Sequence, residues 1–460
     1  MTAADFKNLP VLVLGLGLHG GGVAVTRWLL KQGARVTVTD LKNRLELIES
    51  LRAIGPASYN LVLGAHPLSL LKSGRLIVQN PGVPSDLSLL KAARRRHIPI
   101  ENEASLFLKL CPARQLAAVT GSKGKSTVTS LLGQMVKAWR PGTRVAGNIR
   151  DTVMFDVLTK IKPTTPVVLE LSSWQLEQVG KHKLRLPLAI ITNVLPDHLN
   201  RYHSMADYTA AKAQIFRWQK PGDRLILNYD NLITRSLARH AAAQVYWFST
   251  RHRVSPGIWL SRGQVYISGQ NAVKKIFSAR NLQIPGEHNL ANALAASLAA
   301  YLMGVPLSVI ARVACKFTGL HDRLQLVRKW HDLEFYNDTA ATAPAAAAAA
   351  LAALPRHNLT LIAGGVDKKL TYGHLASLIK QLKVRLVLLP GTATVKLQTA
   401  LRGYQPIVLA ESMAAAVKLA VKLTPPGGTV LLSPGAASFN LFKHEFDRGA
   451  QFAKLVKNLK

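Results

Sequence analysis

A strand, a short loop rich in glycine and lysine, and a helix follow one another near residue 120, and this succession constrains the fold more than any other feature. Residues 115–120 (QLAAVT) have an apolar strand pattern, residues 121–127 read GSKGKST, and residues 128–139 (VTSLLGQMVKAW) have helical periodicity. Free backbone N–H groups and the helix dipole favour an anion at such a junction. The sequence therefore predicts an α/β fold that holds phosphate in this loop.

The spacing of the loop, which we call the phosphate loop (residues 121–127), is G-x-x-G-K-[ST]. Its lysine, Lys125, can neutralise the β and γ phosphates of a nucleotide, and the hydroxyl of Ser126 or Thr127 can hold Mg²⁺. A bland glycine turn would not need the strand, the Gly-Lys-Ser run and the helix together. We therefore predict ATP binding by the whole loop: Gly121, Ser122, Lys123, Gly124, Lys125, Ser126 and Thr127.

Three stretches of the chain repeat the pattern of a short β-branched run followed by a helical segment, which is typical of parallel sheets with crossover helices. We predict three α/β domains: a Rossmann-like domain over 1–112, a central P-loop ATPase-type domain over 113–318, and a second Rossmann-like domain over 319–460. The expected strands are 11–15, 34–40, 115–120, 166–171, 188–194, 333–338, 359–365, 384–391 and 429–435, with helices over 23–33, 128–139 and 284–304.

Composition favours a soluble protein of the cytoplasm. The 460 residues are 48% hydrophobic and 18% charged, which is globular. The two cysteines, Cys111 and Cys315, match no disulfide or metal-ligand spacing, as expected in a reducing compartment. The apolar run 10–25 is interrupted by glycines, and the alanine-rich run 340–354 is too short and weakly apolar to span a bilayer. We expect no membrane insertion and a monomer.

The formal net charge of +35 would usually suggest a polyanionic partner. The basic residues are spread along the chain, and clusters such as 94–97 lack the interleaved aromatic residues of a nucleic-acid platform. We interpret the charge as a solvated basic surface, with no specific nucleic-acid partner. A non-catalytic nucleotide-binding or nucleic-acid-associated protein stays open as the alternative from another functional class.

Several single residues admit both a bland and a functional interpretation. Glu170 ends a buried-type strand, where a carboxylate can bind Mg²⁺, although a paired structural glutamate would look the same. His198 and Lys212 would by themselves be an ordinary histidine and a solvated helix residue. The glycines of residues 15–20 (GLGLHG) resemble a dinucleotide fingerprint, which is weak evidence and leaves an oxidoreductase possible.

The shortened phosphate loop resembles that of the Mur ligase and folylpolyglutamate synthase superfamily, and further motifs follow in the order of that family. Those motifs are VLELSSWQLE (168–177), NVLPDHLNRY (193–202), YTAAKAQIF (208–216), GEHNLANALAA (286–296), GLHDR (319–323), NDTAAT (337–342), AGGVDKK (363–369) and SPGAASFNLFKHEFDRG (433–449). The resemblance covers essentially the whole chain. It is strongest to the D-glutamate-adding Mur ligases.

The resemblance implies an ATP-dependent amide-forming ligase that joins D-glutamate to UDP-N-acetylmuramoyl-L-alanine through an acyl phosphate, in peptidoglycan precursor synthesis. It implies two Mg²⁺ ions, with Glu170, His198 and Ser126 as ligands. Lys212 matches the lysine that CO₂ carbamylates into a carboxylate-like ligand, because a cationic lysine would repel Mg²⁺. Lys125, His198 and Lys212 are the implied catalytic residues.

Further roles follow from the resemblance, one position at a time. The implied nucleotide contacts beyond the phosphate loop are Asn289, Asn292, Arg323 and Asp338. The implied contacts to the UDP substrate are Gly17, Leu18, His19, Asp40, Asn80, Gly82 and Asn148, which would make the N-terminal domain a UDP-binding domain rather than a nicotinamide-binding one. The implied contacts to the incoming amino acid are Thr342, Lys368, Ser438 and Phe446.

Three positions depart from the family pattern. Ser122-Lys123 stand where relatives often have Thr-Asn, and Ala340 stands where they have lysine. The aromatic residue expected shortly after Phe442-Lys443 is displaced, which leaves Glu445 beside Phe446. Two related activities remain as alternatives: another amino-acid-adding Mur ligase and a folylpolyglutamate synthase. The folate enzyme usually lacks the ELSSWQLE pattern, which places it last.

Overall fold

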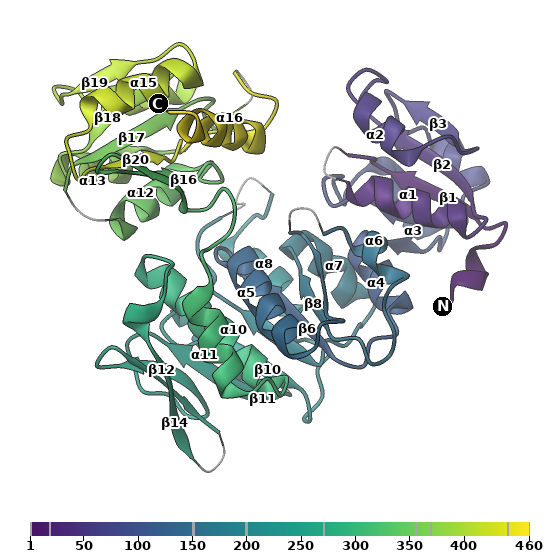
Figure 1. The fold of residues 1–460 in the computed structure, drawn as a ribbon. Coiled ribbons are helices and arrows are strands. Elements are labelled where there is room, and N and C mark those ends of the chain that lie inside the picture. The colour runs from purple at the N-terminus through teal and green to yellow at the C-terminus, as the bar shows by residue number, and fades with distance from the viewer. Residues whose placement is uncertain are drawn as a thin grey trace. The chain divides into compact units, whose positions relative to one another are not determined.

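The fold is that of a computed structural model, which describes residues 2–17, 20–149, 152–197, 201–269, 272–354, 357–368, 370–438 and 441–459. The chain divides into two compact units (Figure 1). The first unit comprises residues 1–281 and 291–315 and contains two sheets. The second comprises residues 282–290 and 316–460 and contains the third sheet. All three sheets are largely parallel, so the α/β fold class predicted from the sequence is confirmed.

The N-terminal sheet has five parallel strands in the order β3-β2-β1-β4-β5. Its central strand β1 is buried on both faces: Val11 and Val13 pack into one apolar cluster, and Leu12 and Leu14 into another. Strand order reverses between β1 and β4, and ligands bind at such switch points in open α/β sheets. The strands are β1 Pro10–Leu14, β2 Arg35–Asp40, β3 Asn60–Leu63, β4 Leu76–Gln79 and β5 Ile100–Glu101.

The central sheet has nine strands in the order β14-β13-β12-β11-β10-β9-β6-β8-β7. Strands β7 to β12 pair in parallel, whereas β12, β13 and β14 form antiparallel hairpins at one edge. The expected pattern of parallel strands did not include this antiparallel edge. The strands are β6 Leu116–Thr120, β7 Arg144–Gly147, β8 Val167–Glu170, β9 Leu188–Ile191, β10 Arg224–Asn228, β11 Gln244–Ser249, β12 Gly257–Ser261, β13 Gln264–Ser268 and β14 Val273–Ser278.

The C-terminal sheet has six strands in the order β15-β16-β20-β17-β18-β19. Only its first pair, β15 with β16, is antiparallel among the described strands of this sheet. The strands β16, β17, β18 and β20 coincide with strands expected from the sequence. The bounds are β15 Gln325–Trp330, β16 Leu333–Asn337, β17 Leu359–Gly364, β18 Arg385–Leu389, β19 Ile407–Leu409 and β20 Thr429–Leu432.

Helices connect these strands and cover the sheets. Those of the first unit are α1 Gly21–Lys31, α2 Ile48–Ile54, α3 Ser88–Arg95, α4 Glu103–Leu110, α5 Lys125–Trp139, α6 Met154–Leu158, α7 Ser173–Lys181, α8 Met205–Ala213 and α9 Leu232–Leu237; short 3₁₀ helices are η1 Ala3–Phe6, η2 Leu68–Lys72, η3 Ala238–His240 and η4 Ala279–Asn281. Helix α10 Glu287–Leu302 begins in the second unit and continues in the first, and α11 Leu307–Lys316 lies in the first unit up to Cys315. Those of the second unit are α12 Pro344–Ala353, α13 Gly373–Gln381, α14 Thr392–Ala400, α15 Met413–Leu423 and α16 Glu445–Lys457.

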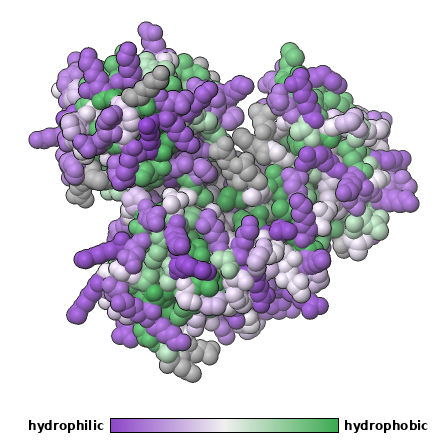
Figure 2. Space-filling view, viewed as in Figure 1, coloured by the Kyte–Doolittle hydropathy of each residue, from purple (hydrophilic) through white to green (hydrophobic). Residues whose placement is uncertain are grey.

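Hydrophilic side chains cover much of the face of the protein drawn in Figure 2, with apolar residues scattered between them. Single exposed apolar residues such as Leu45 and Leu232 are normal on a protein surface. Within the described residues, no helix is long and apolar enough to cross a membrane.

Candidate functional site

The phosphate loop joins β6 to α5 and needs glycine at two positions. Gly121 has φ +152° and Gly124, at the N-terminus of α5, has φ +84°. A Cβ atom at Gly121 would collide with the side chain of Thr192, and one at Gly124 would collide with Asn292. Both positive φ values and both close approaches require glycine. The loop is therefore tightly fitted between neighbouring elements.

Residues that follow β9 hold the phosphate loop in place. The Ser122 N–H donates to the Asn193 carbonyl (2.9 Å), and the Lys123 N–H donates to Asn193 Oδ1 (2.9 Å). The Lys123 carbonyl accepts from Thr192 Oγ1 (2.6 Å). The Leu195 N–H donates to Ser122 Oγ (2.9 Å). Sequence analysis assigned no role to Thr192, and the signal for Asn193 was its place at the start of the NVLPDHLNRY motif.

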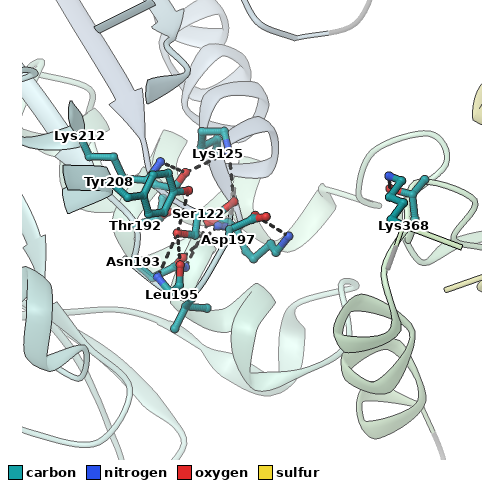
Figure 3. A network of polar contacts seen from close by, with 12 residues as sticks. Ser122, Lys125, Thr192, Asn193, Leu195, Asp197, Tyr208, Lys212 and Lys368 are labelled. Carbon is teal, nitrogen blue, oxygen red and sulfur yellow. Dashed lines mark hydrogen bonds and ion pairs between the residues drawn. The ribbon is translucent and has the colours of Figure 1, made fainter. Parts of the chain in front are cut away.

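Two lysine side chains converge on one carbonyl of the phosphate loop (Figure 3). Lys125 Nζ donates to the Gly121 carbonyl at 3.0 Å, and Lys212 Nζ donates to the same oxygen at 2.8 Å. Lys212 is 1% exposed, although it lies on α8, where a solvated helix face was the bland alternative. Burial, and then the charge of Lys125, lower the pKa of Lys212 to about 6. At neutral pH this amine is therefore mostly uncharged.

Lys123, one of the three departures from the family pattern, forms an ion pair with Asp197. Its Nζ lies 3.0 Å from Asp197 Oδ2, and the lysine side chain is 53% exposed (Figure 3). An exposed ion pair of this kind stabilises a fold by about 0–1 kcal/mol. The extra positive charge in the loop is thus matched by a carboxylate of the residue before His198.

Glu170, predicted to end a buried strand, ends the strand next to the one that leads into the phosphate loop. It ends β8, which pairs directly with β6, and it is 1% exposed. The opposite neighbour β7 pairs Gly147 with Glu170, and Asn148 Nδ2 lies 3.5 Å from Glu170 Oε1. A buried carboxylate beside the phosphate loop is a donor that suits Mg²⁺.

The other predicted metal ligands stand differently. Ser126 is buried in the first turn of α5, next to Lys125. His198 lies outside the described residues. Within the described residues, no three His, Cys, Asp or Glu side chains gather into a metal cluster. A second carboxylate-like ligand would come from Lys212, if its neutral amine were carbamylated.

Tyr208 and Tyr202 form a second layer beneath the two lysines. Lys212 Nζ lies 4.4 Å from the centroid of the Tyr208 ring, and the Tyr208 hydroxyl lies 3.2 Å from Ser122 Oγ. The ring centroids of Tyr202 and Tyr208 are 5.2 Å apart. Sequence analysis gave no role to either tyrosine, although Tyr208 opens the YTAAKAQIF motif.

The residues predicted to contact the nucleotide are distributed over both units. Asn292 is buried against Gly124, so the structure brings this residue to the phosphate loop. Asn289 Nδ2 donates to the Pro285 carbonyl at 2.7 Å, which is a local contact at the start of α10. The adenine role of Asn289 stays a prediction.

In the second unit, Asp338 follows β16 and is buried. Its Oδ2 accepts from Ser433 Oγ (2.7 Å), and its Oδ1 accepts from the Leu324 N–H (3.1 Å). Burial raises the pKa of Asp338 to about 7, against the lowering effect of the Ser433 hydrogen bond and of the nearby Arg323 charge. Arg323 is exposed beside it. The predicted pair of nucleotide contacts therefore lies together.

The predicted amino-acid site is likewise on the second unit. Lys368 Nζ donates to Thr342 Oγ1 at 2.9 Å, so two of the predicted residues are in contact. Ser438 is 1% exposed, and its hydroxyl has no hydrogen-bond partner among the described residues. The Phe446 ring lies 6.0 Å from His444 at the start of α16. Ammonium and hydroxyl donors of this kind suit a carboxylate ligand.

At the N-terminal switch point, Asp40 contacts the glycine loop, the described residues 15–17 and 20, which follows β1. Its Oδ2 accepts from the N–H groups of Leu16 (2.8 Å) and Gly17 (3.3 Å), and its Oδ1 accepts from the Lys42 N–H (3.0 Å). The carboxylate therefore holds the backbone of its own domain in place. Its contact to the UDP substrate stays a prediction and would be made in addition to these backbone hydrogen bonds. Two other predicted contacts, Leu18 and His19, lie outside the described residues.

The loop after β4, which we call the UDP-side loop (residues 80–84), packs on the glycine loop. Asn80 Oδ1 accepts from the Gly82 N–H at 3.0 Å, and a Cβ atom at Gly15 would collide with Val83. These loops line a small cavity together with Glu103, a residue that sequence analysis did not single out. Burial raises the pKa of Glu103 to about 7, with a smaller opposing effect from the Met154 N–H.

Comparison with known families matches each of the three sheets to one domain description. Residues 10–102 match "Mur ligase MurD-like, N-terminal domain". Residues 119–300 match "Mur ligase middle domain", and residues 322–435 match "Mur ligase, glutamate ligase domain".

Curated relatives match over nearly the full length. The UDP-N-acetylmuramoylalanine–D-glutamate ligase of Roseiflexus sp. (strain RS-1) is 41% identical, over 97% of this chain and 98% of its own length. The ligase of the same name from Symbiobacterium thermophilum is 38% identical, over 97% of each chain.

Solved structures share the fold at lower identity. The UDP-N-acetylmuramate–alanine ligase of Thermotoga maritima aligns with a TM-score of 0.64 and 20% identity, covering 98% of this chain and 100% of that chain. A pseudomurein peptide ligase type C from Methanothermus fervidus aligns with a TM-score of 0.59 and 18% identity, over 98% and 100% of the two chains.

Proposed function

Because the chain belongs to the Mur ligase family, we propose that it joins D-glutamate to UDP-N-acetylmuramoyl-L-alanine at the expense of ATP, in peptidoglycan precursor synthesis. The observation that carries the proposal is the convergence of Lys125 and Lys212 on the phosphate loop, within a chain that matches D-glutamate ligases from end to end. Under this proposal the net positive charge is not explained by a nucleic-acid partner, and the N-terminal glycine pattern is not explained by nicotinamide binding.

The reaction consists of two displacements. The L-alanine carboxylate attacks the γ phosphorus of ATP, the bond to the β phosphate breaks, and an acyl phosphate and ADP form. The amine of D-glutamate then attacks the acyl carbon, phosphate leaves, and the amine loses a proton. Lys125 would leave the Gly121 carbonyl to neutralise the transferring phosphoryl group, which is mainly electrostatic and positional catalysis.

Magnesium would neutralise phosphate oxygens when bound, and the donor set fits it. Ser126, Glu170, His198 and a carbamylated Lys212 are the proposed ligands, for two ions. A primary amine attacks CO₂ only when it is unprotonated, and the burial of Lys212 beside Lys125 favours that neutral form. The proposed modification removes a cation from the neighbourhood of Lys125 and supplies a carboxylate in its place.

The remaining assignments are also proposals. We assign UDP binding to residues 1–112, ATP binding to 113–318 and amino-acid binding to 319–460. Asn148 would lie near the reacting end of the UDP substrate, because its amide contacts Glu170. Thr342, Lys368, Ser438 and Phe446 would hold D-glutamate. We propose that the enzyme acts as a monomer in the cytoplasm, where nucleotide substrates are made and where Cys111 and Cys315, which are not joined in a disulfide, stay reduced.

The proposal is tested by phosphate release with a panel of D and L amino acids. Phosphate should appear only when ATP, Mg²⁺, UDP-N-acetylmuramoyl-L-alanine and D-glutamate are all present, and mass spectrometry should detect the extended product. Product with a different amino acid would reassign the enzyme within the family. If no amino acid in the panel gives product, the ligase proposal fails.

A further inference from the structure

Arg201, on the segment after the NVLPDH motif, reaches from the central sheet to the UDP-side loop. Its Nη1 donates to the Pro81 carbonyl at 3.0 Å. Its Nη2 lies 3.6 Å from Glu177 Oε2, and its Cζ lies 4.4 Å from the centroid of the Trp174 ring. The side chain is only 23% exposed. A guanidinium held by a carbonyl, a carboxylate and an aromatic face is fixed in one orientation.

The contacts continue from Arg201 to the phosphate loop. Glu177, the ion-pair partner, accepts a hydrogen bond from the Tyr202 hydroxyl at 2.8 Å. The Tyr202 ring packs on Tyr208, whose hydroxyl reaches Ser122 Oγ. An unbroken series of side-chain contacts therefore runs from the UDP-side loop to the phosphate loop.

Helix α7 is the platform for this series. It begins directly after Glu170 and Leu171, and its residues Trp174 and Glu177 both contact Arg201. The same helix makes two further contacts to the N-terminal domain. The Gln175 carbonyl accepts from Asn102 Nδ2 at 3.0 Å, and Gln178 Nε2 donates to Gln79 Oε1, just before the UDP-side loop, at 3.3 Å.

This arrangement matters for a substrate bound at both ends. Under the proposed function, on which this inference rests, the UDP group binds at the glycine and UDP-side loops while the reacting carboxylate lies near Glu170 and the phosphate loop. The spacing between those loops then decides how the carboxylate meets the γ phosphate. An error of about 1 Å in such placement can lower a rate by about 100-fold.

We propose that Arg201 is a positioning residue for the UDP-linked substrate, which holds the UDP-side loop at a fixed distance from the phosphate loop through the Pro81 carbonyl. Its contacts are with the Pro81 carbonyl, Glu177 and Trp174, so it would act through the loop rather than on the reacting atoms. Asn102 and Gln178 brace the same interface, but Arg201 contacts the UDP-side loop itself.

The test compares Arg201→Met and Arg201→Lys with the wild-type enzyme. For Arg201→Met we expect kcat/KM for UDP-N-acetylmuramoyl-L-alanine to fall by about 30- to 100-fold, with KM for ATP within about twofold. Arg201→Lys keeps a donor for the Pro81 carbonyl but loses the planar stack, so its loss should be smaller. Calorimetric binding of the UDP substrate without ATP should weaken in the same order.

Arg185→Met is the matched control, because Arg185 makes a two-point ion pair with Asp223 in the same unit, remote from the UDP-side loop. It should leave both KM values within about twofold while lowering the melting temperature. If Arg201→Met does not fold, Glu177→Gln, which keeps an acceptor for Tyr202 but loses the charge facing Arg201, takes its place and should show a weaker form of the same pattern.

Two results would overturn the inference: unchanged kcat and UDP-substrate affinity in a folded Arg201→Met variant, or an equal loss in the Arg185→Met control. Failure of the proposed function would look different. In that case the wild-type enzyme itself would form no product, whereas failure of the inference requires an active wild-type enzyme and an equally active Arg201→Met.

Discussion

The phosphate loop and the N-terminal glycine loop have the same backbone arrangement but are surrounded by ionisable side chains of opposite kind. Each joins a buried parallel strand to a helix, and each needs glycines at positive φ, such as Gly124 and Gly15. At the phosphate loop the amines of Lys125 and Lys212 donate to the loop backbone, and that of Lys123 pairs with Asp197. At the glycine loop the corresponding groups are carboxylates.

At the glycine loop, Asp40 accepts from the N–H groups of Leu16 and Gly17, and Glu103 lines the adjoining cavity. Each loop also has one buried ionisable group that burial pushes towards neutrality: the pKa of Lys212 falls to about 6 and that of Glu103 rises to about 7. The glycine pattern is therefore a scaffold, and the charges around it decide what the scaffold can bind.

The largest expected effect comes from removing the amine of Lys125 from the phosphate loop. Lys125→Ala should lower kcat by about 1,000-fold or more, because a preorganised charge at the transferring group is lost. Phosphate release measures it, and the circular dichroism spectrum should not change. Lys137→Ala, an exposed lysine on the same helix, is the control and should keep full activity. Undiminished turnover in Lys125→Ala would show that the amine of the phosphate loop is not needed for phosphoryl transfer, and the proposed difference between the two loops would fail.

The second effect concerns the buried amine of Lys212. Lys212→Ala should lose about 100-fold or more in turnover and regain part of it with added acetate or formate, which can supply the missing carboxylate. Intact-protein mass spectrometry of the wild-type enzyme should show one added CO₂. Full activity of enzyme whose Lys212 is demonstrably unmodified would contradict the proposed role.

A smaller effect is expected at the glycine loop. Asp40→Ala removes the acceptor for three backbone N–H groups, those of Leu16, Gly17 and Lys42. A hydrogen bond to a charged group contributes about 1.5–3 kcal/mol to stability. We expect KM for the UDP substrate to rise about 10-fold while KM for ATP stays constant. Glu49→Ala, which removes an exposed carboxylate on α2, is the control. A rise in both KM values would show that the two loops do not work separately.

The smallest expected effect is on stability and concerns the buried carboxyl of Glu103 beside the glycine loop. Because the pKa of Glu103 is higher in the folded than in the unfolded chain, the folded state binds more protons between about pH 4.5 and 7, and stability falls as pH rises through that window. Glu103→Gln should remove this slope and stabilise the protein at pH 7.5 by about 1–3 kcal/mol. Urea unfolding at pH 5 and 7.5 measures the free energy of unfolding of both proteins. The same change in this free energy between the two pH values in wild type and Glu103→Gln would refute the prediction.

Strands and helices with strong periodicity were predictable because their residues alternate or repeat with the local geometry. The helix expected over 128–139 corresponds to α5, and the strand expected over 34–40 to β2. The antiparallel edge of the central sheet was missed, since β13 and β14 pair through a hairpin. The expected pattern was a strand followed by a helix, which describes parallel pairing only. Their place in the sheet depends on neighbours that local pattern does not reveal.

Sequence analysis could propose site residues where a motif or the family resemblance marked them. Lys125, Glu170 and Lys212 were singled out by motif and by resemblance. Tyr208 and Arg201 were not, because a tyrosine and an arginine in a helix or turn look like ordinary packing or surface residues. Their importance comes from contacts with residues up to about 120 positions away in the chain, such as that of Arg201 with the Pro81 carbonyl.

The sequence by itself determined that this chain builds α/β sheets and which family its motifs resemble, and it predicted phosphate binding by the loop at Gly121 to Thr127. Those properties depend on local backbone chemistry and on the order of residues. Only the tertiary structure decided that Lys212 is buried against Gly121, that Asp197 neutralises Lys123, and that Arg201 connects two loops. Burial, pairing and desolvation depend on what surrounds a group in space, and the chain order does not specify those surroundings.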